Sequence, residues 1–357
     1  MNSTTQLLVF STQSYLDWAR RLNDLGEFEL GEIERKDFLD GEHYHRVVTP
    51  VDDRKVLIVS GTVSDQETLE LFDLANAIID GGARSLQVVL PYFGYSTMER
   101  PVKVGEAVKA KYRARLLSLG LPRAPMGNRF YLLDLHSEGI PQYFENGVQT
   151  KHVYAKPIIT RTAQRLAEKY GETIIASRQL AGVEQKGQAN GSNFVLASAD
   201  AGRMKWIESL ARDLAVPPAF AYKERIDGAR TVSLGVSGPV QGKFVVIYDD
   251  MIRTGSSLMN AAKAYLNAGA TGVAAIATHG LLPGDSLKKI EASGLFREIV
   301  VCDSHPRARA LQSDFLKVES CVELFLPLIY GTTSNGAASN GTTDDSTATG
   351  EIEHAKA

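Results

Sequence analysis

The chain has 357 residues, of which 44% are apolar and 23% charged, and its formal net charge is −3. This length can fill two hydrophobic cores, while the small charge argues against a broad nucleic-acid-binding face. No apolar run is long enough to span a membrane. The two cysteines, Cys302 and Cys321, lack the spacing of a zinc site and the number typical of a disulfide framework. We therefore expect a cytoplasmic protein with two domains and a reduced interior.

Short β-rich runs alternate with amphipathic helices along most of the chain. We expect strands at 55–60, 86–91, 129–136, 173–177, 194–198, 244–250, 272–278 and 298–303. We expect helices at 14–25, 66–80, 107–119, 158–170, 203–215 and 256–267. This alternation predicts an α/β fold with parallel sheets flanked by helices, and it places ligands at the carboxyl ends of the strands.

Two helix–strand units resemble each other and indicate two domains of related architecture. In each unit a helix ends in a Gly-Ala turn, at Gly82 and at Gly269, and leads into a buried strand. We place an N-terminal domain at 1–156 and a C-terminal domain at 157–330. Residues 331–357 are rich in Thr, Ser, Asn, Gly and Ala, which predicts a disordered tail.

The most informative stretch runs from Val245 to Ser257 and reads VVIYDDMIRTGSS. An apolar strand leads directly into Asp249 and Asp250, and then into a small polar turn that opens a helix. Backbone N–H groups at a helix N-terminus are unpaired and electropositive, so they suit a phosphate. Gly255 allows a close approach of the backbone. The pattern predicts a site for a phosphorylated sugar, and its alternative is an acid-rich loop with a capping threonine.

This stretch resembles the phosphoribosyl-pyrophosphate (PRPP) loop of type I phosphoribosyltransferases and of ribose-phosphate pyrophosphokinases. The resemblance implies that Asp249 and Asp250 contact the 2- and 3-hydroxyls of a ribose. It implies that a turn wraps the 5-phosphate, formed by Arg253, Thr254, Gly255, Ser256 and Ser257. The loop alone does not distinguish the two groups of enzymes.

Six further segments, between about residue 30 and residue 325, resemble motifs of the ribose-phosphate pyrophosphokinases in the same order. They are Phe38-Leu39-Asp40-Gly41-Glu42, Leu90-Pro91-Tyr92-Phe93-Gly94-Tyr95, Asp134-Leu135-His136, Asp200-Ala201-Gly202, Tyr222-Lys223-Glu224-Arg225 and Thr278-His279-Gly280. This family resemblance implies two phosphoribosyltransferase-like domains. It also implies transfer of the diphosphoryl group of ATP to the 1-hydroxyl of ribose 5-phosphate, giving PRPP and AMP.

The resemblance also assigns roles to individual residues. It implies catalytic roles for Lys223 and Arg225 at the start of a flexible loop. It also implies that the loop of Asp200, Ala201 and Gly202 receives the pyrophosphoryl group, and that His136 and Asp200 form a Mg²⁺ site. It implies an ATP site formed by Phe38, Asp40, Glu42, Thr97, Met98, Glu99, Arg100 and His136. Because the segment from Phe38 to Glu42 completes the ATP site of a neighbouring subunit in the family, a homo-oligomer is expected. Asp134 is expected to be structural rather than catalytic.

The chemistry of such a transfer fits these residue types. A loose, anionic transition state needs positioning and charge neutralisation more than covalent help from the protein. Lys223 offers a point charge and Arg225 a planar fork of donors. Magnesium prefers a few carboxylates together with water, which fits Asp200 and the pair Asp249 and Asp250.

The sequence departs from the family in three places. Thr97 and Met98 stand where the family usually has arginine and glutamine in contact with ATP, and Arg100 is the nearest cation that could compensate. Arg253 stands where the family commonly has an acid. Residues 178–191 form an insertion that reads as a surface loop or an altered lid.

Two alternative functions follow from these departures. One is a regulatory homologue that has lost turnover and binds active partners. The other is a phosphoribosyltransferase that consumes PRPP. An active synthase fits best, because His136, Asp200, Lys223, Arg225, Asp249 and Asp250 occur together.

Overall fold

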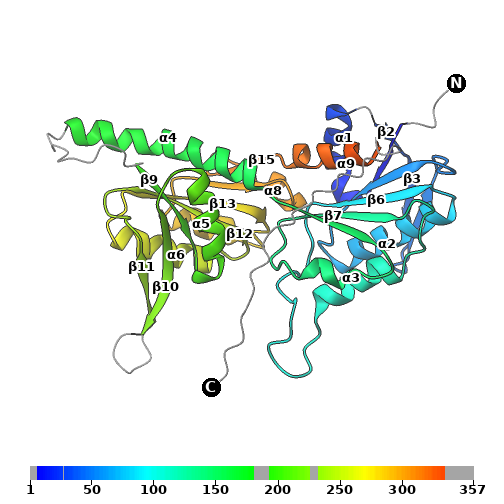
Figure 1. The fold of residues 1–357 in the computed structure, drawn as a ribbon, viewed down its shortest axis with the longest axis horizontal. Coiled ribbons are helices and arrows are strands. Elements are labelled where there is room, and N and C mark those ends of the chain that lie inside the picture. The colour runs from blue at the N-terminus through cyan, green and yellow to red at the C-terminus, as the bar shows by residue number, and fades with distance from the viewer. Residues whose placement is uncertain (1–5, 27, 181–192, 226–231, 334–357) are drawn as a thin grey trace, which may run out of the picture.

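The computed structural model describes residues 6–26, 28–180, 193–225 and 232–333. Two α/β halves lie side by side along the long axis of the molecule (Figure 1). Each half contains a mainly parallel sheet with helices against it. The predicted fold class, two related domains with parallel sheets flanked by helices, is confirmed.

The first half contains a sheet in the order β2-β1-β5-β6-β7-β8, in which all neighbouring strands are parallel. Its strands are β1 (Leu8–Ser11), β2 (Glu29–Leu30), β5 (Lys55–Val59), β6 (Ser85–Leu90), β7 (Asn128–Leu133) and β8 (Gln149–Val153). Its helices are α1 (Leu16–Leu25), α2 (Asp65–Asp80) and α3 (Lys109–Leu119). The central strands are buried on both faces, as their continuous apolar sequences require.

The second half contains a sheet in the order β11-β10-β9-β12-β13-β14-β15, which is parallel except for the antiparallel pair β10 and β11. Its strands are β9 (Phe194–Ser198), β10 (Pro218–Arg225), β11 (Val232–Ser237), β12 (Phe244–Ile252), β13 (Gly272–Gly280), β14 (Ile299–Cys302) and β15 (Leu316–Glu319). Its helices are α4 (Lys156–Leu180), α5 (Met204–Asp213), α6 (Ser256–Asn267), α7 (Ser286–Ala292) and α8 (Pro306–Ala310).

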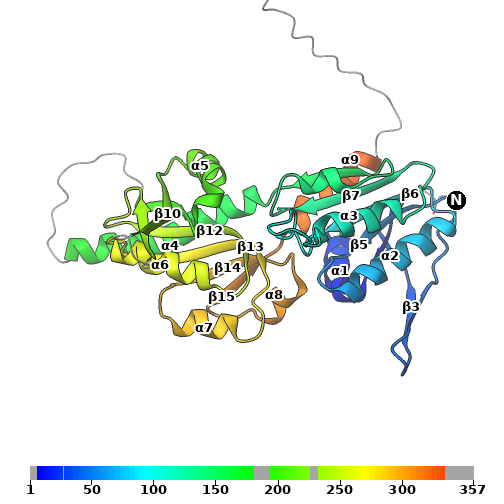
Figure 2. The same cartoon turned by 90° about the horizontal axis from the view of Figure 1, so that it is seen from below.

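A two-stranded hairpin projects from the first half (Figure 2). It consists of β3 (Ile33–Asp37) and β4 (His43–Val47), which pair antiparallel with Asp37 opposite His43. The backbone N–H of Phe38 donates to the carbonyl of Glu42 over 2.9 Å, which closes the tip. The hairpin therefore holds the segment from Phe38 to Glu42 away from the body of its own chain.

The two halves share buried packing. One apolar cluster contains Val9 and Leu57 of the first half together with Leu196 and Val246 of the second. The chain also returns to the first half at its end, in α9 (Leu326–Thr333), where Tyr330 stacks on Phe28 with ring centroids 5.4 Å apart. The predicted domain boundary at residues 156 and 157 coincides with the start of α4. It stays a prediction, because α9 follows the second half in the chain but packs on the first.

Most predicted elements are present, and one is wrong. Residues 173–177, expected to be a strand, continue α4 to Leu180, because the helical pattern of the preceding residues persists through this stretch. The predicted tail begins within α9, whose last turn includes Gly331. The remainder of that tail, at 334–357, lies outside the described residues, as do residues 181–191 of the insertion predicted at 178–191. None of the described helices combines the length and the apolar character needed to cross a membrane.

A buried carboxylate at the end of β14 ties the two halves together. Asp303 accepts a 2.9 Å hydrogen bond from Arg309, a 2.8 Å bond from the backbone N–H of Cys321, and a bond from Arg21 of α1. Burial alone would raise the pKa of Asp303, but the arginine charges and the hydrogen bonds hold it below its usual value.

We predict that Asp303→Asn destabilises the protein by about 2–4 kcal/mol at pH 7, because two arginines lose their buried partner. The native pKa of Asp303 is lowered, so its stabilising contribution is present above about pH 4 and is lost as the pH falls. The difference between variant and wild type should therefore shrink below pH 4. Urea unfolding at several pH values measures both effects, and the exposed Asp314→Asn should change stability by less than about 0.5 kcal/mol. A difference that is independent of pH would contradict this role.

Candidate active site

The carboxyl end of β12 forms the second half's side of the site. Asp250 is 2% exposed near the end of this strand, and its backbone N–H donates to the carboxylate of Asp249 over 2.9 Å. The turn that follows has exposed side chains at Arg253, Thr254, Ser256 and Ser257. Gly255 is the N-cap residue of α6 and has a φ of +77°, a left-handed conformation that favours glycine. The strand, turn and helix predicted for 245–267 are present, and the N-cap residue makes no side-chain capping bond to the start of α6.

The end of β7 forms the first half's side. Asp134 follows this strand with a φ of +36° and is 4% exposed. Its carboxylate accepts hydrogen bonds from Thr278 over 2.5 Å, from the backbone N–H of Ala155 over 3.1 Å, and from Tyr248 over 3.4 Å. Burial raises the pKa of Asp134 to about 6. These contacts agree with the structural role expected for Asp134.

His279 strengthens the same junction. It is buried on β13, and its Nε2 lies 3.1 Å from the carbonyl oxygen of Asp134. Its Nδ1 lies 2.8 Å from Oγ of Ser304. Burial lowers the pKa of His279 to about 4, so this histidine is neutral at pH 7. It acts as a hydrogen-bonded core residue between the halves.

His136 and Asp250 meet across the junction although 114 residues separate them. Nδ1 of His136 lies 2.7 Å from Oδ2 of Asp250. Arg203 also contacts this oxygen at 2.5 Å. Burial would raise the pKa of Asp250, but the hydrogen bond from His136 and the charge of Arg203 lower it to about 2. Burial and then the charge of Asp250 raise the pKa of Asp249 well above its usual value. The pKa values of these two adjacent carboxyls are thus shifted in opposite directions.

Asp200 joins this acidic group from the end of β9. Its side chain is exposed and accepts the backbone N–H of Gly202 over 2.8 Å, and its charge contributes to the raised pKa of Asp249. Within the described residues, no group of three or more His, Cys, Asp or Glu side chains is arranged to hold a metal ion. A site of one or two carboxylates completed by water and substrate phosphates, as Mg²⁺ prefers, needs no such group.

Residues 7–119 match the N-terminal domain of ribose phosphate pyrophosphokinase, and residues 158–325 match the phosphoribosyl synthetase-associated domain. The ribose-phosphate pyrophosphokinase of Rhizobium meliloti is 30% identical over 286 residues, which cover 80% of this chain and 83% of the relative. That of Fusobacterium nucleatum is 28% identical over 333 residues, covering 93% of this chain and 96% of the relative. This chain belongs to the ribose-phosphate pyrophosphokinase family.

The fold agrees with this family. A crystal structure of phosphoribosylpyrophosphate synthetase from Mycobacterium smegmatis superposes with a TM-score of 0.77 at 24% identity. That match covers 93% of this chain and 100% of the other. It supports the architecture of both halves.

The catalytic pair suggested by the family motif lies on a hairpin of the second sheet. Lys223 and Arg225 belong to β10 and pair in register with Leu234 and Val232 of β11. Figure 1 shows β10 and β11 side by side at one edge of this half. The sequence expectation of a loop starting here falls partly on 226–231, which lie outside the described residues.

The segment that departs most from the ribose-phosphate pyrophosphokinase pattern is a turn after Tyr95. The N–H of Met98 donates to the carbonyl of Tyr95 over 2.8 Å, and Tyr143 donates to the carbonyl of Glu99 over 2.7 Å. The side chain of Arg100 is 81% exposed and pairs with Glu99 at 3.5 Å. Thr97 is half-buried and Met98 is 41% exposed. Arg100 is thus an exposed cation held by its neighbour.

The family's adenine motif is separate from this site within one chain. Phe38, Asp40 and Glu42 occupy the exposed tip of the β3–β4 hairpin, where Lys36 lies 4.8 Å above the ring of Phe38. Asp40 accepts the backbone N–H of Glu42 over 3.1 Å. The projecting tip therefore presents its side chains outward rather than to His136 of the same chain.

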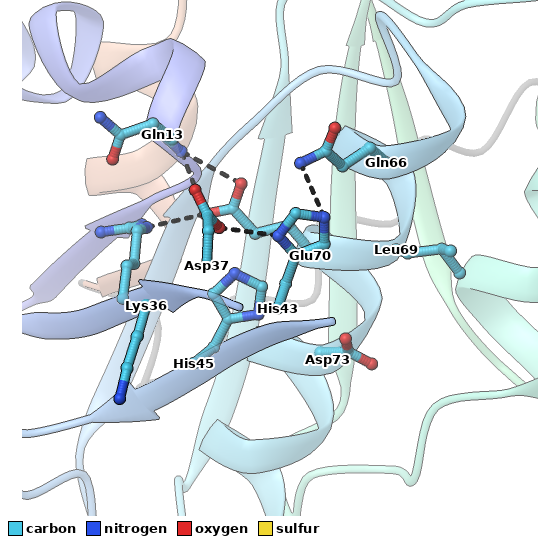
Figure 3. Close-up of a pocket in the computed structure, with 10 residues that line it drawn as sticks. Gln13, Lys36, Asp37, His43, His45, Gln66, Leu69, Glu70 and Asp73 are labelled. Atoms are coloured by element: carbon cyan, nitrogen blue, oxygen red, sulfur yellow. Dashed lines mark hydrogen bonds and ion pairs between the residues drawn. The ribbon is translucent and has the colours of Figure 1, made fainter. Parts of the chain in front are cut away.

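A cavity of about 670 Å³ lies between this hairpin and α2, and Asp249, Asp250 and the turn at 253–257 do not line it. Figure 3 shows His43 and His45 of β4 opposite the side chains of α2. His43 lies 2.7 Å from Asp37 and 3.2 Å from Gln66. Polar side chains that line the cavity therefore contact one another. The cavity is distinct from the centre formed by His136 and Asp250.

Sequence reasoning missed Arg203. It follows the Asp-Ala-Gly motif directly, and it ends a short 3-10 helix (Ala201–Arg203). The available signal was a cation next to a motif assigned to the pyrophosphoryl group. The position of its guanidinium on Asp250 could not be inferred from spacing, because strands β10 and β11 lie between the two residues in the chain.

We predict that Gly255→Ala destabilises this member of the family by about 2–4 kcal/mol. A Cβ atom there would lie 2.5 Å from Cδ1 of Ile290, in addition to the strain of a left-handed alanine. Gly284→Ala is the matched control, since Gly284 has a φ of +54° but no atom lies within 4 Å of the position that an added methyl group would take. That control should lose about 1–2 kcal/mol. Urea unfolding compares the two, and equal losses would contradict the packing argument.

Proposed function

We propose that this protein is a ribose-phosphate diphosphokinase, which transfers the diphosphoryl group of ATP to the 1-hydroxyl of ribose 5-phosphate. The observation that carries the proposal is the contact of His136 with Asp250. It joins the family's Asp-Leu-His motif in one half to the PRPP loop in the other. The membership of the chain in the ribose-phosphate pyrophosphokinase family supports the same activity.

Ribose 5-phosphate binds in the second half. Asp249 and Asp250 accept hydrogen bonds from its 2- and 3-hydroxyls, because carboxylates at the end of a parallel strand face the ligand edge of the sheet. The turn of residues 253–257 and the N-terminus of α6 hold its 5-phosphate through unpaired N–H groups and hydroxyls. Arg253 adds a cation to this cradle.

The transfer proceeds by in-line attack. The oxygen of the 1-hydroxyl forms a bond to the β-phosphorus of ATP, and the bond from that phosphorus to the α,β-bridging oxygen breaks. AMP leaves with the electron pair, and the hydroxyl proton passes to solvent. Lys223 and Arg225 neutralise the transferring group, which suits a transition state in which charge is spread over the phosphoryl oxygens.

The residues present fit Mg²⁺. Asp200 is exposed and its charge acts on Asp249. A hard cation of this kind takes one or two carboxylates and completes its shell with water and phosphate oxygens. We assign the metal to Asp200 and His136, where it would neutralise phosphate charge and orient the ATP. Binding of the cation would also favour the deprotonated form of Asp249.

ATP binds against His136 and the segment of Thr97, Met98, Glu99 and Arg100. The exposed tip of the hairpin, with Phe38, Asp40 and Glu42, completes the ATP site of a neighbouring subunit, so the active form is a homo-oligomer. Its outward projection in Figure 2 supports this arrangement. The reaction belongs in the cytoplasm, which supplies both substrates.

The first test is incubation of the purified protein with ATP, ribose 5-phosphate and Mg²⁺. We expect AMP and PRPP in equal amounts, measured by chromatography with detection of both products. If neither product forms while ribose 5-phosphate still binds, the proposed enzymatic activity is contradicted and a regulatory homologue is favoured.

We predict that Lys223→Ala lowers turnover roughly 10²- to 10³-fold, because one charge that stabilises the transition state is removed. The dissociation constant for ribose 5-phosphate should stay within about threefold, since the sugar binds through β12 and α6. Lys288→Ala, at an exposed position of α7, is the control and should leave both quantities unchanged. Near-normal turnover of Lys223→Ala would contradict its catalytic role.

A further inference from the structure

Arg203 lies at the meeting point of the two halves. Its Nη2 is 2.5 Å from Oδ2 of Asp250, 3.3 Å from Nδ1 of His136 and 3.4 Å from the carbonyl oxygen of His136. The side chain is 15% exposed. A flexible cation is thereby fixed between the residue assigned to the ribose and the residue assigned to the nucleotide.

These contacts use a single nitrogen of the guanidinium. A guanidinium carries five N–H donors in a planar fork that suits a phosphate or a carboxylate. Among the described residues, the hydrogen bonds and ion pairs of Arg203 all involve Nη2. The donors on Nε and Nη1 are therefore available to an anion that enters between the halves.

The position of Arg203 in the chain indicates which anion this is. Arg203 follows directly after the loop of Asp200, Ala201 and Gly202, which is assigned to the pyrophosphoryl group. It also supplies a cation in a chain that has Thr97 where an arginine for ATP is expected. Asp250 and Asp200 would repel a diphosphate, and a fixed positive charge on Asp250 offsets that repulsion.

We propose that Arg203 binds the diphosphoryl group transferred from ATP, with Asp250 and His136 holding its guanidinium in place. The proposal rests on the proposed function for the identity of the donor, and it adds a substrate-binding residue to the site. Arg203 contacts the β- and γ-phosphates through Nε and Nη1 while Nη2 stays on Asp250.

Binding measurements on Arg203→Gln test this assignment without turnover. Calorimetry with inorganic pyrophosphate and Mg²⁺ should show roughly 10- to 100-fold weaker binding than wild type, as expected for loss of a charged hydrogen-bonding group. The dissociation constant for ribose 5-phosphate should change by less than about threefold. If Arg203 merely holds Asp250 in position, ribose 5-phosphate binding would weaken instead, and this outcome would overturn the proposal.

Two further variants sharpen the experiment. Arg203→Lys keeps the charge but loses the planar fork, so its pyrophosphate affinity should lie between those of the wild type and Arg203→Gln. Arg165→Gln is the matched control, since Arg165 also pairs with a buried carboxylate, Glu298, at 2.9 Å. It should leave both affinities unchanged.

The same variants separate the two proposals. Absence of AMP and PRPP from the wild-type reaction would refute the proposed enzyme, yet a selective loss of pyrophosphate binding in Arg203→Gln would still support Arg203. Pyrophosphate affinity within about threefold of wild type in Arg203→Gln would overturn the assignment, even when the wild type is fully active.

Discussion

The buried carboxylate of Asp134 is the contact on which the geometry of the site depends. Asp134 comes from the first sheet and bonds to Thr278 and Tyr248 of the second, while His279 of that sheet lies against its carbonyl oxygen. A carboxyl group in this position is costly unless it is well hydrogen-bonded. The two halves must therefore keep one relative position at this point. His136, two residues further along, is brought to Asp250 as a consequence.

Desolvation at this junction also sets the charges of the site. Asp249 and Asp250 are adjacent and largely buried, so both cannot be ionised without compensation. His136 and Arg203 compensate Asp250, and Asp249 is left with a raised pKa. Protonation is thus more favourable at Asp249 than at Asp250. An arriving metal ion would meet one ionised carboxylate and one that releases its proton on binding.

The sequence predicted well those features that are local. The strand, acidic pair, turn and helix between 245 and 267 follow from hydrophobic periodicity and the helix-start pattern, and α6 has the predicted bounds. The hairpin of β3 and β4 was not predicted as strands, because its sequence shows no apolar alternation. One of its faces is only half-buried and the other is exposed. The prediction of a strand at 173–177 was wrong because a short apolar run is compatible with a helix as well as with a strand.

Features that join distant parts of the chain could not be derived from periodicity. The bond from Thr278 to Asp134 spans 144 residues, and that from His136 to Asp250 spans 114. The family motifs predicted that His136 and Asp250 belong to one site, but they contained no signal for Arg203. Its role depends on which carboxylate its guanidinium reaches, and this is decided by the packing of two sheets.

The departures of this chain from its family have one shared consequence, which is a change in where positive charge lies. The first half lacks the cation expected at Thr97, and Arg100 is exposed beside Glu99. The second half carries Arg253 in the PRPP loop and Arg203 after the Asp-Ala-Gly motif. Burial raises the pKa of Tyr92, and the charge of Arg253 opposes this rise. These two cations at the motif positions are thus carried by the second half. In the proposed site, nucleotide binding would then depend less on the segment after Tyr95 than on the contact between the two halves at Asp134.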